Sequence, residues 1–387
     1  MAAVASPPSH SRRWLRPFVW LAVVAETAVL AVALVGALAA YLPPHAFWWA
    51  QLVALGLPYW TALLALATLS LVLRKQRGWA LSYAVLLAWV LVRTVPLGWA
   101  GTAPEASPDD LVLLTFNTPA SGASREVLAD GVYAFFEQTV PTVASLQEAI
   151  TITSETQRWQ PNHLDLVTDS LRYRVPMPPF EANGMAQTAV PLYVRPDQAA
   201  PDGFVVLEQR GHTLMPDEDY PSEVLRTHFR WRGREGVHYN LHLASFGMDK
   251  PWNDGVPFYS LSGGLGYLRQ YRDAVRRRGR HVEAIRALVD AETLPVLISG
   301  DFNTTPYTWS FRQLRQSRTD AFRTRGRGWG GTYRADLPFV RIDFVLADPA
   351  WEIVRAEVPS LFLSDHKPLL VRLRWADAEE GTEEPAE

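Results

Sequence analysis

The stretch Leu294-Pro295-Val296-Leu297-Ile298-Ser299-Gly300-Asp301-Phe302-Asn303 passes from apolar to polar residues within a few positions. Its apolar half has the composition of a short buried strand. Gly300 and Asp301 then form a common turn dipeptide, and Asn303 follows directly after it. A turn alone explains such polar residues. A functional interpretation therefore requires that other strands end in the same way.

Five further predicted strands also have a ligand-type polar residue at or beside one end. The strands over 111–116, 142–146, 237–243, 341–346 and 369–373 are accompanied by Asn117, Glu148, His242, Asp343 and His366. Helical spacing over 124–139 and 281–291 indicates helices between strands, and 224–231 is predicted to pair with 237–243 as a hairpin. Strand ends of one sheet can converge on a single rim, so these polar residues are predicted to share a site.

The first 100 residues have the composition of membrane helices. Apolar runs cover 18–42, 47–73 and 79–100, and each is close to the roughly 20 residues that cross a bilayer. We therefore predict three transmembrane helices. The only charged residues from Phe18 to Ala100 are Glu26, Arg74, Lys75, Arg77 and Arg93.

Basic residues predict the orientation of these helices. Arg12, Arg13 and Arg16 precede the first run, and Arg74-Lys75-Gln76-Arg77 separates the second run from the third. The positive-inside rule places both clusters in the cytoplasm, so the chain after residue 100 is predicted outside the cytoplasmic (inner) membrane. A cleaved signal peptide ending at Ala37-Leu38-Ala39 is the alternative for the first run, and it also leaves the later domain outside.

Two charged residues lie within the predicted spans. Arg93 is near the outer end of the third run, where its side chain is expected to reach the lipid headgroups. Glu26 lies deeper in the first run, and the sequence names no partner for it. Charged residues inside a membrane are candidate functional residues, so both positions need a structural explanation.

Composition narrows the chemistry of the chain. Its 387 residues include no cysteine, which excludes disulfides, thiolate metal sites and cysteine nucleophiles. The net charge of −3 disfavours a strongly basic nucleic-acid-binding protein. Two arginine-rich stretches, 269–280 and 323–327, are interpreted as solvated surface, with docking to anionic headgroups as the alternative.

The ordered strand-end motifs resemble the endonuclease/exonuclease/phosphatase superfamily of metal-dependent phosphoesterases. This resemblance implies an α+β fold, a four-layer αββα sandwich of two mixed sheets, here preceded by three transmembrane helices. The three spans look more narrowly like the membrane-anchored bacterial branch that includes VanJ-type glycopeptide-resistance proteins. The matching pieces are Leu113-Leu114-Thr115-Phe116-Asn117, Val143-Ala144-Ser145-Leu146-Gln147-Glu148, Tyr239-Asn240-Leu241-His242-Leu243, Gly300-Asp301-Phe302-Asn303, Arg341-Ile342-Asp343-Phe344 and Ser364-Asp365-His366-Lys367-Pro368.

The resemblance also implies a role for each of these polar residues. Glu148 matches the metal-ligand glutamate, Asn117 helps to orient the metal or phosphate, and Asp365 could add a ligand for Mg²⁺, with Mn²⁺ as the alternative cation. Asp301 would align the attacking water, and Asn303 would bind a phosphoryl oxygen. Asp343 would orient His366, which together with His242 would face the charge of the phosphoryl group.

The sequence departs from the family pattern in two places. Asn117-Thr118-Pro119 lacks the aspartate that some nucleases place two residues after the asparagine. Residues 183–196 match an expected arginine-bearing strand poorly, which leaves substrate contacts from that segment open.

These observations predict a membrane-anchored, metal-dependent phosphohydrolase that acts on a phosphoester or pyrophosphate carried by a lipid. The partners expected are the lipid bilayer and a phosphate-containing substrate, with nucleic acid less favoured. The alternatives are an extracytoplasmic Mg²⁺-dependent nuclease and an inactive membrane-bound binding module. The predicted organisation is a cytoplasmic N-terminus (1–17), a three-helix anchor (18–100), a linker (101–110), a catalytic domain (111–375) and an acidic disordered tail (376–387).

Overall fold

The computed structural model describes residues 16–94, 104–118, 125–149, 151–152, 170–175, 187–195, 203–217, 222–247, 260–337 and 339–376. The predicted N-terminal segment (1–17) and acidic tail (376–387) lie almost entirely outside the described residues, as do positions 101–103 of the predicted linker.

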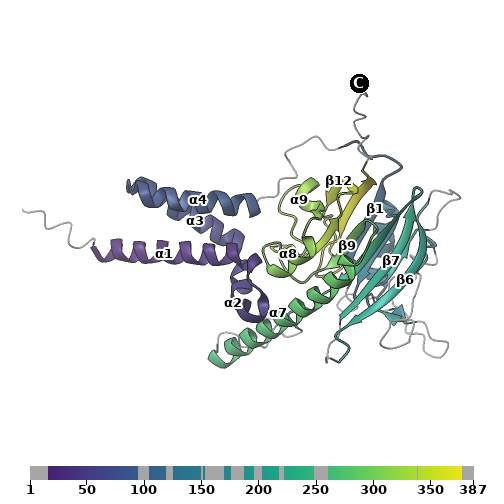
Figure 1. The fold of residues 1–387 in the computed structure, drawn as a ribbon, viewed down its shortest axis with the longest axis horizontal. Helices are drawn as coiled ribbons and strands as arrows, with labels where there is room; N and C mark the ends of the chain where they lie inside the picture. The colour runs from purple at the N-terminus through teal and green to yellow at the C-terminus, as the bar shows by residue number, and fades with distance from the viewer. Residues whose placement is uncertain are drawn as a thin grey trace, which may run out of the picture.

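Two mixed β-sheets lie face to face at the centre of the part of the chain that follows the N-terminal helices (Figure 1). In the five-stranded sheet β1 and β2 are parallel, and the other neighbours are antiparallel. In the six-stranded sheet β8 and β9 are the parallel pair. The five-stranded order is β12 (Trp351–Glu357), β13 (Leu369–Trp375), β1 (Leu111–Asn117), β2 (Val143–Gln147) and β5 (Leu192–Val194). The six-stranded order is β10 (Thr319–Asp320), β11 (Asp343–Ala347), β9 (Val296–Asp301), β8 (Arg234–His242), β7 (Ser222–Trp231) and β6 (Val205–Leu214), and a separate short pair is β3 (Thr151–Ile152) with β4 (Gln187–Thr188).

Helices cover the outer faces of both sheets, which confirms the predicted αββα sandwich. On the five-stranded sheet, α5 (Arg125–Thr139) packs Phe136 against Phe116 and Leu146. On the six-stranded sheet, α7 (Leu261–Asp290) and α8 (Trp309–Arg315) pack Val282 and Phe311 in a buried cluster. The short helix α9 (Ala321–Arg325) follows β10 and joins the apolar layer between the sheets through Phe322.

Alternation along the strands divides the layer between the sheets into an apolar end and a polar end. On β1, Leu111 and Leu113 belong to the apolar cluster, whereas Thr115 and Asn117, two and four positions later, are buried polar residues. On β9 the same two-residue step passes from Leu297 through Ser299 to Asp301. Because side chains two positions apart share a strand face, both sheets bring polar side chains to the same end of the sandwich.

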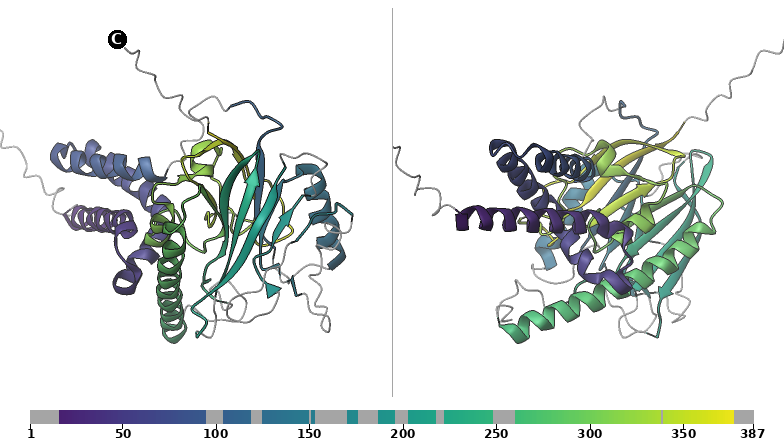
Figure 2. Two further views of the ribbon diagram at one scale, coloured as in Figure 1. Left: turned by 45° about the vertical axis from the view of Figure 1, so that its right-hand side comes forward. Right: turned by 60° about the vertical axis from the view of Figure 1, so that its left-hand side comes forward.

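The N-terminal third forms a bundle that extends from one side of the sandwich (Figures 1 and 2). Its apolar cluster contains Ala33 of α1, Leu64 of α3 and Leu86 of α4. The elements are α1 (Arg16–Leu38), the 3₁₀ turn η2 (Ala39–Tyr41), α2 (Pro44–Leu55), α3 (Leu57–Leu73) and α4 (Arg77–Thr94).

The predicted second span is not one straight helix. It divides at Gly56 into α2 and α3, which are bent by 64° from each other. A Cβ at Gly56 would lie 2.8 Å from the indole Nε1 of Trp60, so a larger residue there would require the indole to move. By length and apolarity, Pro17–Tyr41 could cross a membrane, and α2 with α3 would make a second span only as a bent pair. Three transmembrane helices therefore remain a prediction.

The structure provides partners for both charged residues of the predicted spans. Glu26 forms an ion pair with Arg74, which lies at the end of α3. The guanidinium of Arg93 donates to the carbonyl oxygen of Ala37, near the end of α1, and lies over the rings of Tyr41 and Trp89. Arg93 is thus held at a helix end by contacts within the bundle. The sequence had suggested instead that its side chain extends to the lipid headgroups.

Candidate active site

The predicted site residues come together at the polar end of the sandwich. Asn117 ends β1, Glu148 follows β2, His242 ends β8 and Asp301 ends β9. The two parallel strand pairs, β1 with β2 and β8 with β9, therefore direct their carboxyl ends to one rim. Asp343 begins the antiparallel β11 directly opposite Asp301, which brings it to the same place.

The structure places Gly300 and Asp301 at the end of strand β9 and not in a turn, and glycine is required at this strand end. Gly300 has φ +137°, a conformation that other residues rarely adopt, and a Cβ there would lie 2.0 Å from the backbone oxygen of Leu241. The close approach of β9 to β8 thus excludes any side chain. This local requirement explains why the sequence places glycine directly before the buried aspartate.

Asp301 is the most heavily hydrogen-bonded carboxylate of the site. Its Oδ1 accepts the backbone N–H of Asn303 at 2.8 Å, and its Oδ2 accepts Nδ2 of Asn303 at 3.0 Å and Nδ2 of Asn117 at 3.1 Å. Burial raises the pKa of Asp301, while the nearby His366 and His242 oppose that rise. The surroundings thus orient the carboxylate and increase its affinity for a proton relative to a solvent-exposed aspartate.

Asn117 and Glu148 fit the cation that the family requires. The amide Nδ2 of Asn117 donates to Oε1 of Glu148 at 3.1 Å as well as to Asp301. Its Oδ1 is buried and has no hydrogen-bond partner among the described residues. An unsatisfied buried oxygen beside a carboxylate matches the oxygen ligands that Mg²⁺ prefers. Glu148 and Asn303 also have positive φ angles of 56° and 48°, which is typical of residues held at functional sites.

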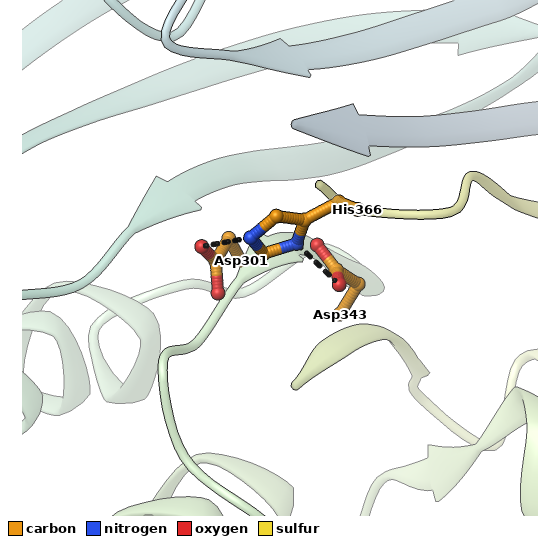
Figure 3. Close-up of side chains that lie close together, drawn as sticks. All are labelled: Asp301, Asp343 and His366. Atoms are coloured by element: carbon orange, nitrogen blue, oxygen red, sulfur yellow. Dashed lines mark hydrogen bonds and ion pairs between the residues drawn. The ribbon is translucent and has the colours of Figure 1, made fainter. Parts of the chain in front are cut away.

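His366 lies between two carboxylates (Figure 3). Its Nδ1 is 2.9 Å from Oδ2 of Asp343, and its Nε2 is 3.8 Å from Oδ2 of Asp301. Burial disfavours the charged ring, but the carboxylates of Asp343 and Asp301 outweigh burial and raise the pKa of His366 to about 9. The ring is therefore protonated at neutral pH and can neutralise negative charge on a phosphoryl group.

His242 faces the two acidic parts of the site. Its Nε2 lies 3.6 Å from Oε1 of Glu148 and 3.7 Å from Oδ2 of Asp301. This nitrogen is buried and makes no hydrogen bond within the described structure. It is available to a substrate oxygen placed between the two acids.

Asp301, Asp343 and His366 form a buried cluster whose potential ligand atoms lie within 4.8 Å of one another, so this cluster could hold a metal ion. Because Asp343 and His366 already share a hydrogen bond, we interpret this pair as an orienting pair and place the cation nearer Asn117 and Glu148. Asp365 is exposed beside His366 and is not part of the cluster, so its role as a metal ligand stays a prediction.

Two further buried residues, Gln147 and Asn240, support the site, although the sequence indicated no role for them. Nε2 of Gln147 donates to Oδ1 of Asn240 at 2.8 Å, and Nδ2 of Asn240 donates to backbone carbonyls of Leu146, Val190 and Pro191. This network links β2 to β8, the strands that carry Glu148 and His242. Gln147 directly precedes Glu148, and Asn240 lies two residues before His242. Because side chains alternate along a strand, Asn240 shares a strand face with His242, and this alternation could have identified it.

The fold and the site define a metal-dependent phosphoric ester hydrolase. Residues 114–366 match the Endonuclease/Exonuclease/phosphatase family, to which the chain therefore belongs. Members of this family are metal-dependent phosphoesterases. The narrower likeness to VanJ-type proteins stays a prediction.

Several solved structures are similar to this chain at low sequence identity. An endonuclease/exonuclease/phosphatase from Bacteroides vulgatus is 19% identical with a TM-score of 0.48, and the match covers 69% of this chain and 99% of that chain. A mannosyl-6-phosphatase from Bacteroides thetaiotaomicron is 16% identical with a TM-score of 0.49, over 68% and 100% of the two chains. A humanized TDP2 from D. rerio is 14% identical with a TM-score of 0.48, over 69% and 99%. No curated protein sequence matches the chain.

Proposed function

We propose that the chain is a phosphohydrolase anchored in the cytoplasmic membrane, with its site on the outer side, and that its substrate is a phosphoester or pyrophosphate carried by a lipid. The observation that carries this proposal is the short distance along the chain from the site to the bundle. Asn303 contacts Asp301, and four residues later Tyr307 packs into the apolar clusters of the N-terminal helices. A site tied so closely to the bundle suits a substrate that stays in the bilayer.

The surface of the bundle supports its insertion into lipid. Large apolar side chains remain strongly exposed along the helices, among them Trp20 at 70%, Leu73 at 73% and Leu81 at 67%. So many large exposed apolar side chains are unfavourable in water, and a membrane or a protein partner would cover them. The few charges in the apolar runs agree with a membrane.

The contacts between bundle and sandwich agree with the predicted orientation. Nε of Arg276 donates to the carbonyl of His45, between the first two apolar runs. The backbone N–H of Trp309 donates to Oε1 of Gln51 on α2, and Arg323 donates to the carbonyl of Arg93 at the end of α4. All three bundle residues lie at the ends that the positive-inside rule places outside. The catalytic part would therefore rest on the outer surface of the cytoplasmic membrane.

The side chains of the site support a division of chemical work. Asn117 and Glu148 would hold the divalent cation, which when bound would neutralise charge on the phosphoryl oxygens. Asp301, fixed by three hydrogen bonds, would orient the attacking water and accept its proton. Protonated His366, held by Asp343, and His242 would bind phosphoryl oxygens as negative charge develops on them.

The test is a phosphate-release screen with the full-length protein in nanodiscs and Mg²⁺. The substrates are a lipid-linked pyrophosphate, a phosphatidic acid, a water-soluble phosphomonoester and plasmid DNA. The variants Glu148→Gln and Asp301→Asn should lose turnover. Glu357→Gln removes a carboxylate on β12 whose hydrogen bonds go to Arg355, and this variant should retain turnover.

The outcomes distinguish the candidate functions. The proposal is supported if the unmodified protein prefers lipid-borne substrates and if both site variants lose this turnover. Cleavage of plasmid DNA in preference to the lipids would instead assign a nuclease, and its rate should then fall steeply as salt increases. Absence of both turnover and Mg²⁺ binding would assign a catalytically inactive binding module.

A further inference from the structure

An open cavity of about 300 Å³ lies where the bundle meets the sandwich, outside the active site. One wall consists of the outer ends of the bundle, with Tyr41 after α1 and Trp89 on α4. The opposite wall is formed by α8, α9 and the loop that contains Pro306. Four arginines line this cavity: Arg93, Arg312, Arg315 and Arg323.

The positive charge of this arginine cavity is not balanced within the described structure. None of the four guanidinium groups forms an ion pair with a carboxylate of the described residues. Asp320 is the single acidic residue of the lining, and both of its oxygens already accept from Arg341, at 2.8 and 2.7 Å. The cavity therefore gathers four cations around one carboxylate that a fifth arginine neutralises.

Two of the arginines are fixed in place and two are free to bind. Arg93 and Arg323 donate to backbone carbonyls at the ends of α1 and α4. Arg312 and Arg315 are exposed on α8 and make no side-chain hydrogen bond to a described residue. The guanidinium of Arg312 lies 4.5 Å from the centre of the Tyr41 ring, which holds it toward the bundle. Burial and the nearby Arg315 and Arg341 lower the pKa of Arg323, which means that the charged form of this side chain is disfavoured. An anion in the cavity would stabilise that charged form.

We propose that the arginine cavity binds the phosphate headgroup of an anionic phospholipid. Planar guanidinium groups bind phosphate oxygens in pairs, which suits a cluster of this kind. The cavity opens beside Val92, an apolar residue exposed on α4, so a headgroup bound there would leave its acyl chains along the bundle. Lipid phosphates are the anions present in quantity at this depth, and that distinguishes a lipid from free phosphate as the occupant.

This inference rests on membrane placement and not on the reaction catalysed in the site. A lipid bound here would contact both the bundle and the loop of residues 305–307, which also lines a smaller cavity next to it. It would therefore hold the catalytic part in one position against the bilayer. We therefore expect the unfolding temperature of the protein to be higher with an anionic phospholipid than with a neutral one.

The test uses the full-length protein and native mass spectrometry of lipid adducts, with thermal unfolding as a second measurement. The probes are phosphatidylglycerol, phosphatidylcholine and inorganic phosphate, each added to the delipidated protein in neutral detergent. We expect retention of phosphatidylglycerol in preference to phosphatidylcholine, with a matching rise in the unfolding temperature. In the Arg312→Gln/Arg315→Gln double variant the affinity for phosphatidylglycerol should fall by about 30-fold, as expected when two charge contacts are lost.

The matched control is Arg355→Gln, which removes an exposed arginine on β12, and it should bind phosphatidylglycerol like the unmodified protein. Equal retention of phosphatidylglycerol by the unmodified protein and the double variant would overturn the proposal. Equal retention of both lipids by the unmodified protein would overturn it too, as would stabilisation by inorganic phosphate with no effect of lipid. Because Arg312 and Arg315 are exposed, the double variant should fold, and unchanged phosphate release in detergent verifies this.

Discussion

Asn303 and Tyr307 connect the active site to the bundle within a single turn of chain. The side chain of Asn303 donates to Oδ2 of Asp301 at 3.0 Å, whereas Tyr307 packs against the clusters formed by the N-terminal helices. The hydroxyl of Thr304, directly after Asn303, shares a hydrogen bond of 2.7 Å with that of Thr308, directly after Tyr307, which stabilises this segment. A displacement of the bundle should therefore change the position of Asn303 and, through it, of Asp301.

Truncation of Tyr307 should weaken catalysis on a membrane-borne substrate more than on a soluble one. Tyr307→Ala removes the ring that fixes this turn against the bundle, and small misplacements of catalytic groups are costly. We expect kcat/KM for a lipid-linked pyrophosphate in nanodiscs to fall by about tenfold or more. Tyr307→Phe keeps the ring and should behave like the unmodified protein. An equal loss for a soluble phosphoester would contradict the coupling and indicate a general defect.

Removal of the Asp343 carboxylate should reduce kcat through its effect on His366. In Asp343→Asn the ring loses the partner 2.9 Å from Nδ1 that favours its protonated form. The expected loss in kcat is about 10²- to 10³-fold, with little change in KM. Because the two residues act as a pair, the double variant Asp343→Asn/His366→Gln should be little worse than His366→Gln alone. Multiplicative losses in steady-state kinetics would show that the two residues act independently.

Glu148 should determine the affinity for the divalent cation. Replacement by Gln removes a charge beside the unpaired Oδ1 of Asn117, so Mn²⁺ or Mg²⁺ binding, measured by titration calorimetry, should weaken by at least about tenfold. Chelation by EDTA should abolish phosphate release, and added Mg²⁺ should restore it. If Glu148→Gln binds the cation as tightly as the Glu357→Gln control, the ligand assignment is wrong.

The buried His238 should make folding stability depend on pH. Burial lowers its pKa to about 3, from the ordinary 6.5, and its Nε2 lies 2.7 Å from Oγ of Ser299 in the layer between the sheets. Only the unfolded chain then binds a proton between these two values. Stability from the neutral ring is thus complete above pH 6.5 and decreases as the pH falls toward 3, by about 2 kcal/mol at pH 5.

Thermal unfolding of the full-length protein between pH 7.5 and 4.5 tests this dependence. His238→Gln keeps a hydrogen-bonding group but cannot titrate, so the gap in unfolding temperature between the two proteins should narrow as the pH falls. Parallel curves would show that His238 does not contribute.

Much of the sandwich and its site followed from local patterns. Apolar strands that stop at Asn117, Glu148, Asp301 and similar residues were recognisable because burial and the two-residue alternation of a strand are written in adjacent positions. The same alternation makes Ser299 and Asn240 inward-facing. Their hydrogen bonds across the sandwich depend on how the sheets align, which no single strand reveals.

Other features depend on contacts between segments far apart in the chain. The partner of Glu26 is Arg74, and the carbonyl bound by Arg93 belongs to Ala37; helix packing brings these residues together. The arginine-rich stretches are solvated only in part. Arg269, Arg280 and Arg327 are exposed. Arg278 is buried and donates to the carbonyl of Ala244, and Arg323 donates to backbone carbonyls at the end of α4.

The sequence by itself determined the family, the residue types of the site and the apolar character of the first hundred residues. These properties are local, because they reside in composition, periodicity and short motifs. Tertiary structure alone decided the bend at Gly56 and the contacts of Asn303 with Asp301 and of Tyr307 with the N-terminal helices. It also decided that Arg312, Arg315 and Arg323 lie beside Arg93. Each of these arises because two elements pack at a particular angle, and packing energies depend on the shapes of both surfaces.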